Sequence, residues 1–158
     1  MLEFEHIIQV NDLTDSSISP LSRAQLWEGL MLRARRPDKF VPNLTVHTED
    51  LASDEFERTI IAGESRFLEQ VVVHPDGRIH TKTVDEIEQI SAESITQIEE
   101  PEEGYLFVRF IYKRELEIEN DGIDVGEHLK SAYLETDRDA IAMIRELAES
   151  GLFGESIN

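Results

Sequence analysis

The sequence predicts one α+β domain, in which an antiparallel sheet packs against a long C-terminal helix. Three observations support this fold class. Strand patterns follow one another between residues 41 and 117, turn residues separate them, and the last third of the chain changes to helical periodicity. Consecutive strands joined by short turns favour antiparallel pairing, and a helix with one apolar face must cover a sheet. With 158 residues and no linker-like or repeated segment, we expect a single domain over residues 1–158.

The beginning of the chain predicts a strand followed by a helix. Apolar and polar side chains alternate over residues 3–12, which places His6 among apolar neighbours on one face. Ser22 and Gln25 then have the spacing of a capping box, a pair that satisfies free backbone N–H groups in the first helical turn. We expect this helix over residues 22–36, because the next residue is a proline.

The middle of the chain predicts a run of strands joined by tight turns. Pro75-Asp76-Gly77 combines a residue of fixed φ with one that tolerates positive φ, and Pro101 to Gly104 repeats this combination in a longer loop. The strands are expected over residues 44–49, 56–62, 66–74, 78–84, 91–99 and 105–116.

The last third of the chain predicts a long amphipathic helix. Apolar side chains recur every three or four residues over residues 129–147, which describes one continuous apolar face. Gly151 follows as a plausible helix end. This helix is the element that we expect to cover the sheet.

Composition excludes several classes of partner. The formal charge is -19, from 34 acidic and 15 basic residues, and such a chain repels nucleic acid and anionic lipid. The sequence starts without a basic, unbroken apolar leader and contains no membrane span, so we expect no membrane insertion and a cytoplasmic location. The chain has no cysteine, which fits a reducing compartment.

Several separated segments carry a resemblance to a known family. They are Phe4-Glu5-His6, Val10-Asn11, Gln25-Leu26-Trp27-x-Gly29-Leu30 with Arg33-Ala34, Glu99-Glu100-Pro101-x-x-Gly104, Leu106-Phe107-x-Arg109-Phe110-x-Tyr112, Lys130-Ser131-Ala132-Tyr133 and Ile144-Arg145-Glu146-Leu147. In this order they resemble the AtaL-like family of unknown function, within the START and birch-pollen-allergen (SRPBCC) superfamily. The resemblance implies a helix-grip fold: a seven-stranded antiparallel sheet wrapped around a long C-terminal helix, two short helices after the first strand, and a hydrophobic cavity. Residues 85–93 depart from the family pattern, because acidic residues stand where small glycines are expected.

The strand over residues 66–74 offers a candidate carboxylate. Phe67, Glu69 and Val71 share one face, so an inward-facing register places Glu69 in an apolar cavity wall. Burial then raises the pKa of this carboxyl group unless a cation meets it. The alternative register turns Glu69 to water.

Two tyrosines and one phenylalanine are further candidates for ligand contact. Phe110 and Tyr112 share a face of the last strand, while Tyr133 lies on the apolar stripe of the long helix. The two hydroxyl groups then converge from opposite walls and orient a ligand; otherwise they satisfy structural hydrogen bonds.

The first helix supplies the remaining candidates. Trp27 and Leu30 follow its apolar spacing and either line a cavity or pack in the core. Arg33 belongs to a basic cluster with Arg35, Arg36 and Lys39 at the helix C-terminus, where cations interact well with free carbonyls. The sharper alternative places Arg33 at a cavity mouth, paired with a ligand carboxylate or phosphate.

Other chemistry has little support in the sequence. His6 is either a core residue or an acid or base near neutral pH. The remaining histidines lack metal-ligand spacing, and no phosphate-binding or nucleophile motif is present, so we expect no metal and no cofactor. The hydroxyl groups of Thr81, Thr83, Ser94 and Thr96 alternate with apolar residues, which predicts a mostly apolar ligand with a few polar functions.

The leading functional hypothesis is therefore the binding of a hydrophobic or amphipathic metabolite, such as a lipid, a polyketide-like molecule or an aromatic compound. One alternative is an enzyme of the cyclase, dehydratase or isomerase type that positions a substrate beside one acid or base. The other is a protein-interaction or co-chaperone domain with an acidic surface. Homodimer formation is left open.

Overall fold

The computed structural model describes residues 1–84, 90–116 and 124–153. Its centre is a seven-stranded sheet in the order β1-β7-β6-β5-β4-β3-β2, in which every neighbouring pair is antiparallel. The sheet confirms the predicted α+β class. The strands are β1 (Leu2–Gln9), β2 (Leu44–Ala52), β3 (Glu55–Ala62), β4 (Ser65–His74), β5 (Arg78–Thr83), β6 (Ala92–Glu102) and β7 (Tyr105–Arg114).

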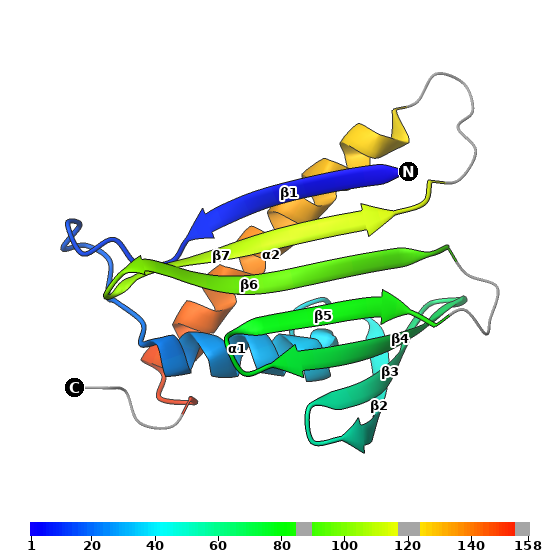
Figure 1. Ribbon diagram of the computed structural model, residues 1–158, viewed down its shortest axis with the longest axis horizontal. Coiled ribbons are helices and arrows are strands. Elements are labelled where there is room, and N and C mark those ends of the chain that lie inside the picture. Colours follow the sequence, from blue (N-terminus) through cyan, green and yellow to red (C-terminus); the bar gives the residue numbers. More distant parts are fainter. Residues whose placement is uncertain (85–89, 117–123, 154–158) are drawn as a thin grey trace.

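The helices are α1 (Arg23–Arg35) and α2 (Val125–Glu149), with a single 3-10 turn, η1 (Pro37–Lys39), after α1. The second of the two expected short helices is therefore this one turn. Helix α2 runs diagonally across the sheet, and α1 lies beside its C-terminal part (Figure 1). We call the sheet face toward these helices the inner face. In the described part of the chain, no helix is long and apolar enough to cross a membrane.

Helix α1 begins with the predicted capping box. The Ser22 hydroxyl accepts a hydrogen bond from the Gln25 backbone N–H (3.0 Å), and the Gln25 side chain accepts one from the Ser22 N–H (2.9 Å). Arg36 leaves the helical conformation with φ of -133°, and Pro37 opens η1. The helix therefore occupies the predicted range, because its first turn is satisfied locally and a proline ends it.

The predicted turns depend on glycines in the left-handed region. Gly77 has φ of 102° between β4 and β5, and Gly104 has φ of 85° between β6 and β7. A side chain is strained at such φ values, whereas glycine is not. These turns connect antiparallel neighbours, as predicted.

The core lies between the inner face and the two helices. It includes Phe56 of β3, Val71 of β4 and Phe110 of β7, which are all fully buried. Because side chains alternate along a strand, buried Val71 places Phe67 and Glu69 on the inner face too, which is the first of the two predicted registers.

Helices α1 and α2 approach each other closely at a glycine. A Cβ atom at Gly29 would lie 2.4 Å from Cγ2 of Ile144, which is fully buried. Only a residue without a side chain permits this packing distance. The contact fixes the position of α2 above the sheet.

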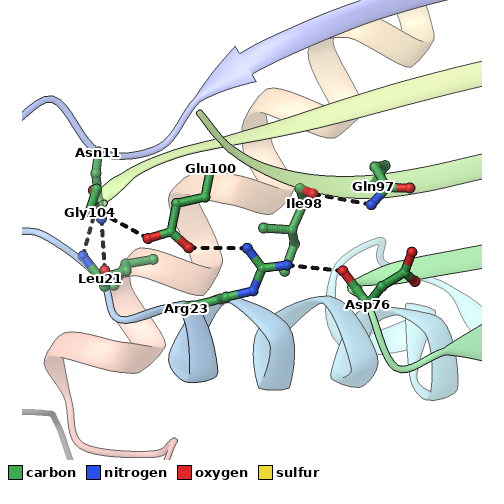
Figure 2. A network of polar contacts seen from close by, with 8 residues as sticks. All are labelled: Asn11, Leu21, Arg23, Asp76, Gln97, Ile98, Glu100 and Gly104. Atoms are coloured by element: carbon green, nitrogen blue, oxygen red, sulfur yellow. Dashed lines mark hydrogen bonds and ion pairs between the residues drawn. The ribbon is translucent and has the colours of Figure 1, made fainter. Parts of the chain in front are cut away.

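A polar network closes the end of the sheet where α1 begins, and Figure 2 shows it in close view. Asn11 is 1% exposed, and its side-chain amide donates to the Leu21 carbonyl (2.7 Å) and to the Gly104 carbonyl (3.1 Å). Its side-chain oxygen accepts from the Leu21 N–H (2.8 Å). Asn11 thus joins the loop before α1 to the β6–β7 turn.

Arg23 extends this network to the β4–β5 turn. Its guanidinium donates to the Glu100 carboxylate (3.1 Å) and to the Asp76 carbonyl (3.0 Å) (Figure 2). Glu100 in turn accepts from the Gly104 N–H (2.9 Å). The first turn of α1 is consequently fixed to two hairpin turns of the sheet.

Candidate functional site

A cavity of about 330 Å³ lies between the inner face of the sheet and the helices. Leu30 of α1, Phe40 after η1 and Ile79 of β5 form part of its apolar wall. Ala132 and Thr136 of α2 line the cavity and are exposed, so they mark its opening to solvent. The volume is near the lower end of the range for small-molecule sites, roughly 300–1,000 Å³.

Asp137 of α2 is the centre of the polar part of this cavity. It is fully buried (0% exposed), yet its carboxylate lies among three donors from three other elements. His6 Nε2 lies 2.7 Å from Oδ2, Arg33 Nη2 donates to Oδ1 (2.8 Å), and the Tyr112 hydroxyl lies 2.6 Å from Oδ2 and 2.8 Å from Oδ1. A buried carboxylate needs such partners, because an unpaired charge has a high desolvation cost.

The sheet register brings two of these donors together. His6 of β1 pairs with Phe110 of β7, and Phe4 pairs with Tyr112, so the His6 and Tyr112 side chains lie on the same face of adjacent strands. Arg33 reaches the same carboxylate from the last turn of α1. Arg33, in the last turn of α1, therefore lies in the wall of the cavity.

Aromatic stacking holds the rings of this cluster in place. The Tyr112 and Tyr133 rings are parallel within 10°, with centroids 3.9 Å apart. The His6 ring stacks on Phe4 (5.4 Å) and on Phe110 (5.0 Å). These contacts restrict ring rotation and keep the Tyr112 hydroxyl directed at Asp137.

The protonation of Tyr112 and the tautomer of His6 follow from this geometry. Burial raises the pKa of the Tyr112 hydroxyl well above its ordinary value of 10.0, and the negative charge of Asp137 raises it further. Tyr112 therefore stays protonated at neutral pH and donates to Asp137. Because a carboxylate only accepts, the hydrogen of His6 is assigned to Nε2; His6 Nδ1 is buried and has no partner among the described residues.

A second arginine lines the cavity from the sheet. Arg58 of β3 donates through Nε to Glu69 of β4 (2.8 Å) and through Nη1 to the Ala34 carbonyl (2.6 Å). Ala34 lies in the last turn of α1, where carbonyls lack helical partners. Arg58 thus joins the sheet to the C-terminal end of α1. Glu69, which does not line the cavity, pairs with Arg58 and orients its guanidinium group.

The structure brings only some of the predicted site residues to the cavity. Leu30, Arg33, Tyr112 and Tyr133 line it, as do the predicted hydroxyl residues Thr81, Ser94 and Thr96. The lining does not include Trp27, Phe67, Glu69, Val71 or Phe110.

These five residues have other surroundings. Val71 and Phe110 are fully buried core residues, and Trp27 packs against the core. Phe67 is 40% exposed, near the start of β4. Glu69 is paired with Arg58.

The rest of the basic cluster lies at a different place. Arg35, Arg36 and Lys39 line a second, more open cavity of about 810 Å³ between α1 and the C-terminal turns of α2. Arg36 is paired with Asp38 (2.8 Å) and Arg35 with Asp50 (2.9 Å). We call this second cavity the outer cavity, and the cavity between the sheet and the helices the inner cavity. Of the basic cluster, only Arg33 lines the inner cavity.

Asp137 and Arg58 are site residues that were not predicted from the sequence. Asp137 had a signal: it lies four residues after Tyr133 and three before Ala140, and so falls on the apolar stripe of α2. Arg58 shares the inner face with buried Phe56, two residues earlier on β3. In both cases a charged residue at an inward position was the available sign.

Metal ligation has no support in the described part of the chain, where no group of three or more His, Cys, Asp or Glu side chains lies together. The sequence-based expectation of no metal and no cofactor stays a prediction.

The seven-stranded antiparallel sheet and the long C-terminal helix form a helix-grip fold, which a START superfamily protein shares. The particular family follows from the sequence. Residues 8–151 match the family model of AtaL, acetylaranotin biosynthesis cluster protein L, and the chain belongs to this family. The predicted resemblance is thereby confirmed. No curated protein matches the sequence.

Solved structures show the same fold at low sequence identity. The di-domain aromatase/cyclase StfQ of the steffimycin biosynthetic pathway matches with a TM-score of 0.68 and 12% identity, over 94% of this chain and 51% of that one. The Zhui aromatase/cyclase from Streptomyces sp. R1128 matches with 0.63 and 11%, over 95% and 94% of the two chains. A START superfamily protein from Mycobacterium smegmatis matches with 0.62 and 10%, over 93% and 99%. The chain spans about half the length of StfQ and of the similar BexL, at 51% and 50%.

Proposed function

We propose that this protein binds a hydrophobic or amphipathic metabolite in the inner cavity. The observation that carries the proposal is the cavity itself: about 330 Å³, mostly apolar walls and one localised polar cluster around Asp137. Sites for small molecules have this composition, because apolar walls supply affinity and a few polar groups fix orientation. The fold shared with aromatase/cyclases and a START protein agrees with this proposal.

The ligand classes that fit are lipid-like, polyketide-like or aromatic. The stacked rings of Tyr112 and Tyr133 offer a flat surface beside Leu30, and Thr81 and Thr96 add hydroxyl groups on the sheet side. Flat surfaces favour aromatic ligands through offset stacking. The small volume favours a ligand of few rings over a long double-chain lipid.

Native mass spectrometry of freshly purified protein tests this function. The expected result is a stoichiometric adduct that denaturing extraction releases as an apolar or amphipathic small molecule. Tyr133→Ala removes one stacked ring from the cavity wall and should reduce adduct occupancy several-fold.

Leu152→Ala is the matched control, because Leu152 lies in the outer cavity and is 59% exposed. An adduct that disappears with Leu152→Ala but persists with Tyr133→Ala contradicts binding in the inner cavity.

Catalysis is a second candidate, which one observation favours. Asp137 and the Tyr112 hydroxyl, a carboxylate and a proton donor in contact with each other, both line the cavity. A bound substrate beside one positioned acid or base is sufficient for cyclisation, dehydration or isomerisation. His6 is not part of the lining, so its role there is to orient Asp137.

Incubation of the extracted ligand with the protein distinguishes catalysis from binding alone. An enzyme converts it to a product that differs in retention time or by the loss of one water. Asp137→Asn should abolish the conversion of the ligand. Asp139→Asn, a substitution at an exposed position two residues away on α2, should retain it. An unchanged ligand in the presence of wild-type protein supports carriage alone.

Two further attributes stay proposals from the sequence. We place the protein in the cytoplasm, in keeping with a chain that contains no cysteine. A homodimer is testable by light scattering coupled to size-exclusion chromatography.

A further inference from the structure

Two arginines line the same small cavity in a chain with more than twice as many acidic as basic residues, 34 against 15. Arg33 enters from α1 and Arg58 from β3. Each is paired with one carboxylate, Asp137 at 2.8 Å and Glu69 at 2.8 Å, so the charges of these four side chains balance. The two carboxylates differ in position, because Asp137 lines the cavity and Glu69 does not.

Asp137 has little capacity left to accept a hydrogen bond from a ligand. Oδ1 receives Arg33 and Tyr112, and Oδ2 receives His6 and Tyr112. The Tyr112 hydroxyl has one hydrogen, which the two oxygens share, so three donated hydrogens meet about four lone-pair sites. The protein's own donors therefore use most of the acceptor capacity of this buried carboxylate.

The arginines, in contrast, have donors left over. Within the described residues, Arg33 uses Nη2 alone, and Arg58 uses Nε and Nη1. A guanidinium carries N–H groups on all three nitrogens, so Nε and Nη1 of Arg33 and Nη2 of Arg58 are available. The polar part of the cavity is consequently richer in free donors than in free acceptors.

We propose, on the basis of the binding function above, that the cavity selects ligands with an oxygen acceptor, above all an anionic one such as a carboxylate, sulfonate or phenolate. Arg58 and Arg33 are the recognition residues, and the apolar body of the ligand lies against Leu30 and Tyr133. Glu69 is a positioning residue, because it orients Arg58 without contacting the cavity. Anionic oxygens bind guanidinium groups more strongly than neutral acceptors do, because the hydrogen bond is charge-assisted.

Two fluorescent dyes that differ in one group test this selectivity. N-phenyl-1-naphthylamine is neutral, and 8-anilinonaphthalene-1-sulfonate carries a sulfonate on the same framework. Titration of the wild-type protein with each dye gives two Kd values and their ratio. In Arg58→Gln the Kd of the sulfonate dye should rise about tenfold, while that of the neutral dye changes little.

A paired variant protects the test against loss of folding. Arg58→Gln leaves Glu69 without its cation, whereas Arg58→Gln combined with Glu69→Gln removes both charges together. The double variant should show the same loss of selectivity for the sulfonate. Lys39→Gln, which changes a cation of the outer cavity, is the control and should leave the ratio of the two Kd values unchanged.

The location of the dyes is established with Ala132→Trp, an exposed position at the cavity opening. This variant should weaken both dyes several-fold. Suppose that both dyes bind and that both are weakened by Ala132→Trp. If the Kd ratio is then unchanged in Arg58→Gln and in the double variant, the proposed selectivity for anionic ligands is refuted, while the proposed binding function stands. If neither dye binds, or if Ala132→Trp affects neither, the binding function is contradicted and the selectivity falls with it.

Discussion

The hydroxyl group of Tyr112 on β7 lies 2.6 Å from one oxygen of Asp137 on α2 and 2.8 Å from the other. This contact joins the sheet to the long helix through Asp137, which is fully buried. It also places a neutral donor and a carboxylate in the wall of one cavity. The same two residues therefore join two elements of the fold and form part of the cavity wall.

Replacement of Asp137 should destabilise the fold. Asp137→Asn removes the negative charge that Arg33 faces and leaves a cation that is 21% exposed without its partner. We expect the free energy of unfolding to fall by about 2–4 kcal/mol, since breaking a largely buried ion pair has a cost of this size. Urea unfolding followed by circular dichroism measures it. Asp139→Asn, exposed on the same helix, should change stability by less than about 0.5 kcal/mol, and equal losses in the two variants contradict the assignment.

Stability at alkaline pH should depend on Tyr112. Its pKa is raised in the folded state, so above about pH 10 the unfolded chain loses a proton that the native state keeps. Stability from this group is thus complete below the unfolded pKa and is lost as pH rises. Between about pH 10 and 11, the wild type should lose up to about 1.4 kcal/mol per pH unit more than Tyr112→Phe.

The absorbance of ionised tyrosine provides an independent reading of the same group. Native wild type and native Tyr112→Phe should show equal absorbance changes up to about pH 11, because Tyr112 does not ionise in the folded state. A smaller change in Tyr112→Phe means that the hydroxyl is accessible, which is incompatible with its buried hydrogen bonds to Asp137.

Gly29→Ala should destabilise the protein despite the better helix propensity of alanine. The added Cβ would lie 2.4 Å from Cγ2 and 2.8 Å from Cγ1 of Ile144, so one helix must shift. We expect a loss of about 1–3 kcal/mol in the free energy of unfolding, as for other overpacked cores. In an Ile144→Ala background the same change should cost much less. Additive effects in the double variant would show that the two residues do not compete for space.

The polar network at the end of the sheet should make the protein sensitive to acid. The backbone N–H of Gly104 and the guanidinium of Arg23 lower the pKa of Glu100 below its ordinary value of 4.5. The stability that ionised Glu100 contributes is therefore present above about pH 4.5 and lost as pH falls through the lowered native value. Glu100→Gln should lower Tm at pH 7 and have a smaller effect at about pH 3. A Tm difference that is the same at both pH values contradicts this linkage.

Local sequence signals predicted most of the elements. The capping box of Ser22 and Gln25 determined where α1 starts, and glycines with positive φ at positions 77 and 104 determined two hairpin turns. These features act within a few residues, so a sequence displays them. The length of β2 was less predictable: it continues to Ala52, beyond the predicted end at residue 49, because pairing with β3 extends through an irregularity between Asp50 and Ala52.

The polar cluster was harder to predict, because its partners are distant in sequence. Asp137 lies 131 residues from His6, 104 from Arg33 and 25 from Tyr112. Three of the four residues were recognised individually, but no spacing rule connects them. Asp137 belongs to a residue type that is rarely buried, although its position on the apolar stripe of α2 implied burial.

Glu69 illustrates the limit of a single-strand pattern. Alternation on β4 allowed an inward register for this carboxylate, and buried Val71 confirms that register. Its partner Arg58 lies on β3, and the pairing of Arg58 with Glu69 depends on how the two strands align. Such cross-strand partners require the sheet register, which one strand does not contain.

Whether the inner cavity holds the ligand can be measured by backbone amide NMR during titration with N-phenyl-1-naphthylamine. If the ligand binds there, the largest chemical-shift changes will occur at residues of the inner cavity, among them Thr81, Ser94 and Tyr133. Changes centred instead on Met31, Met143 and Leu152 of the outer cavity, or no changes at saturating dye, would contradict binding in the inner cavity.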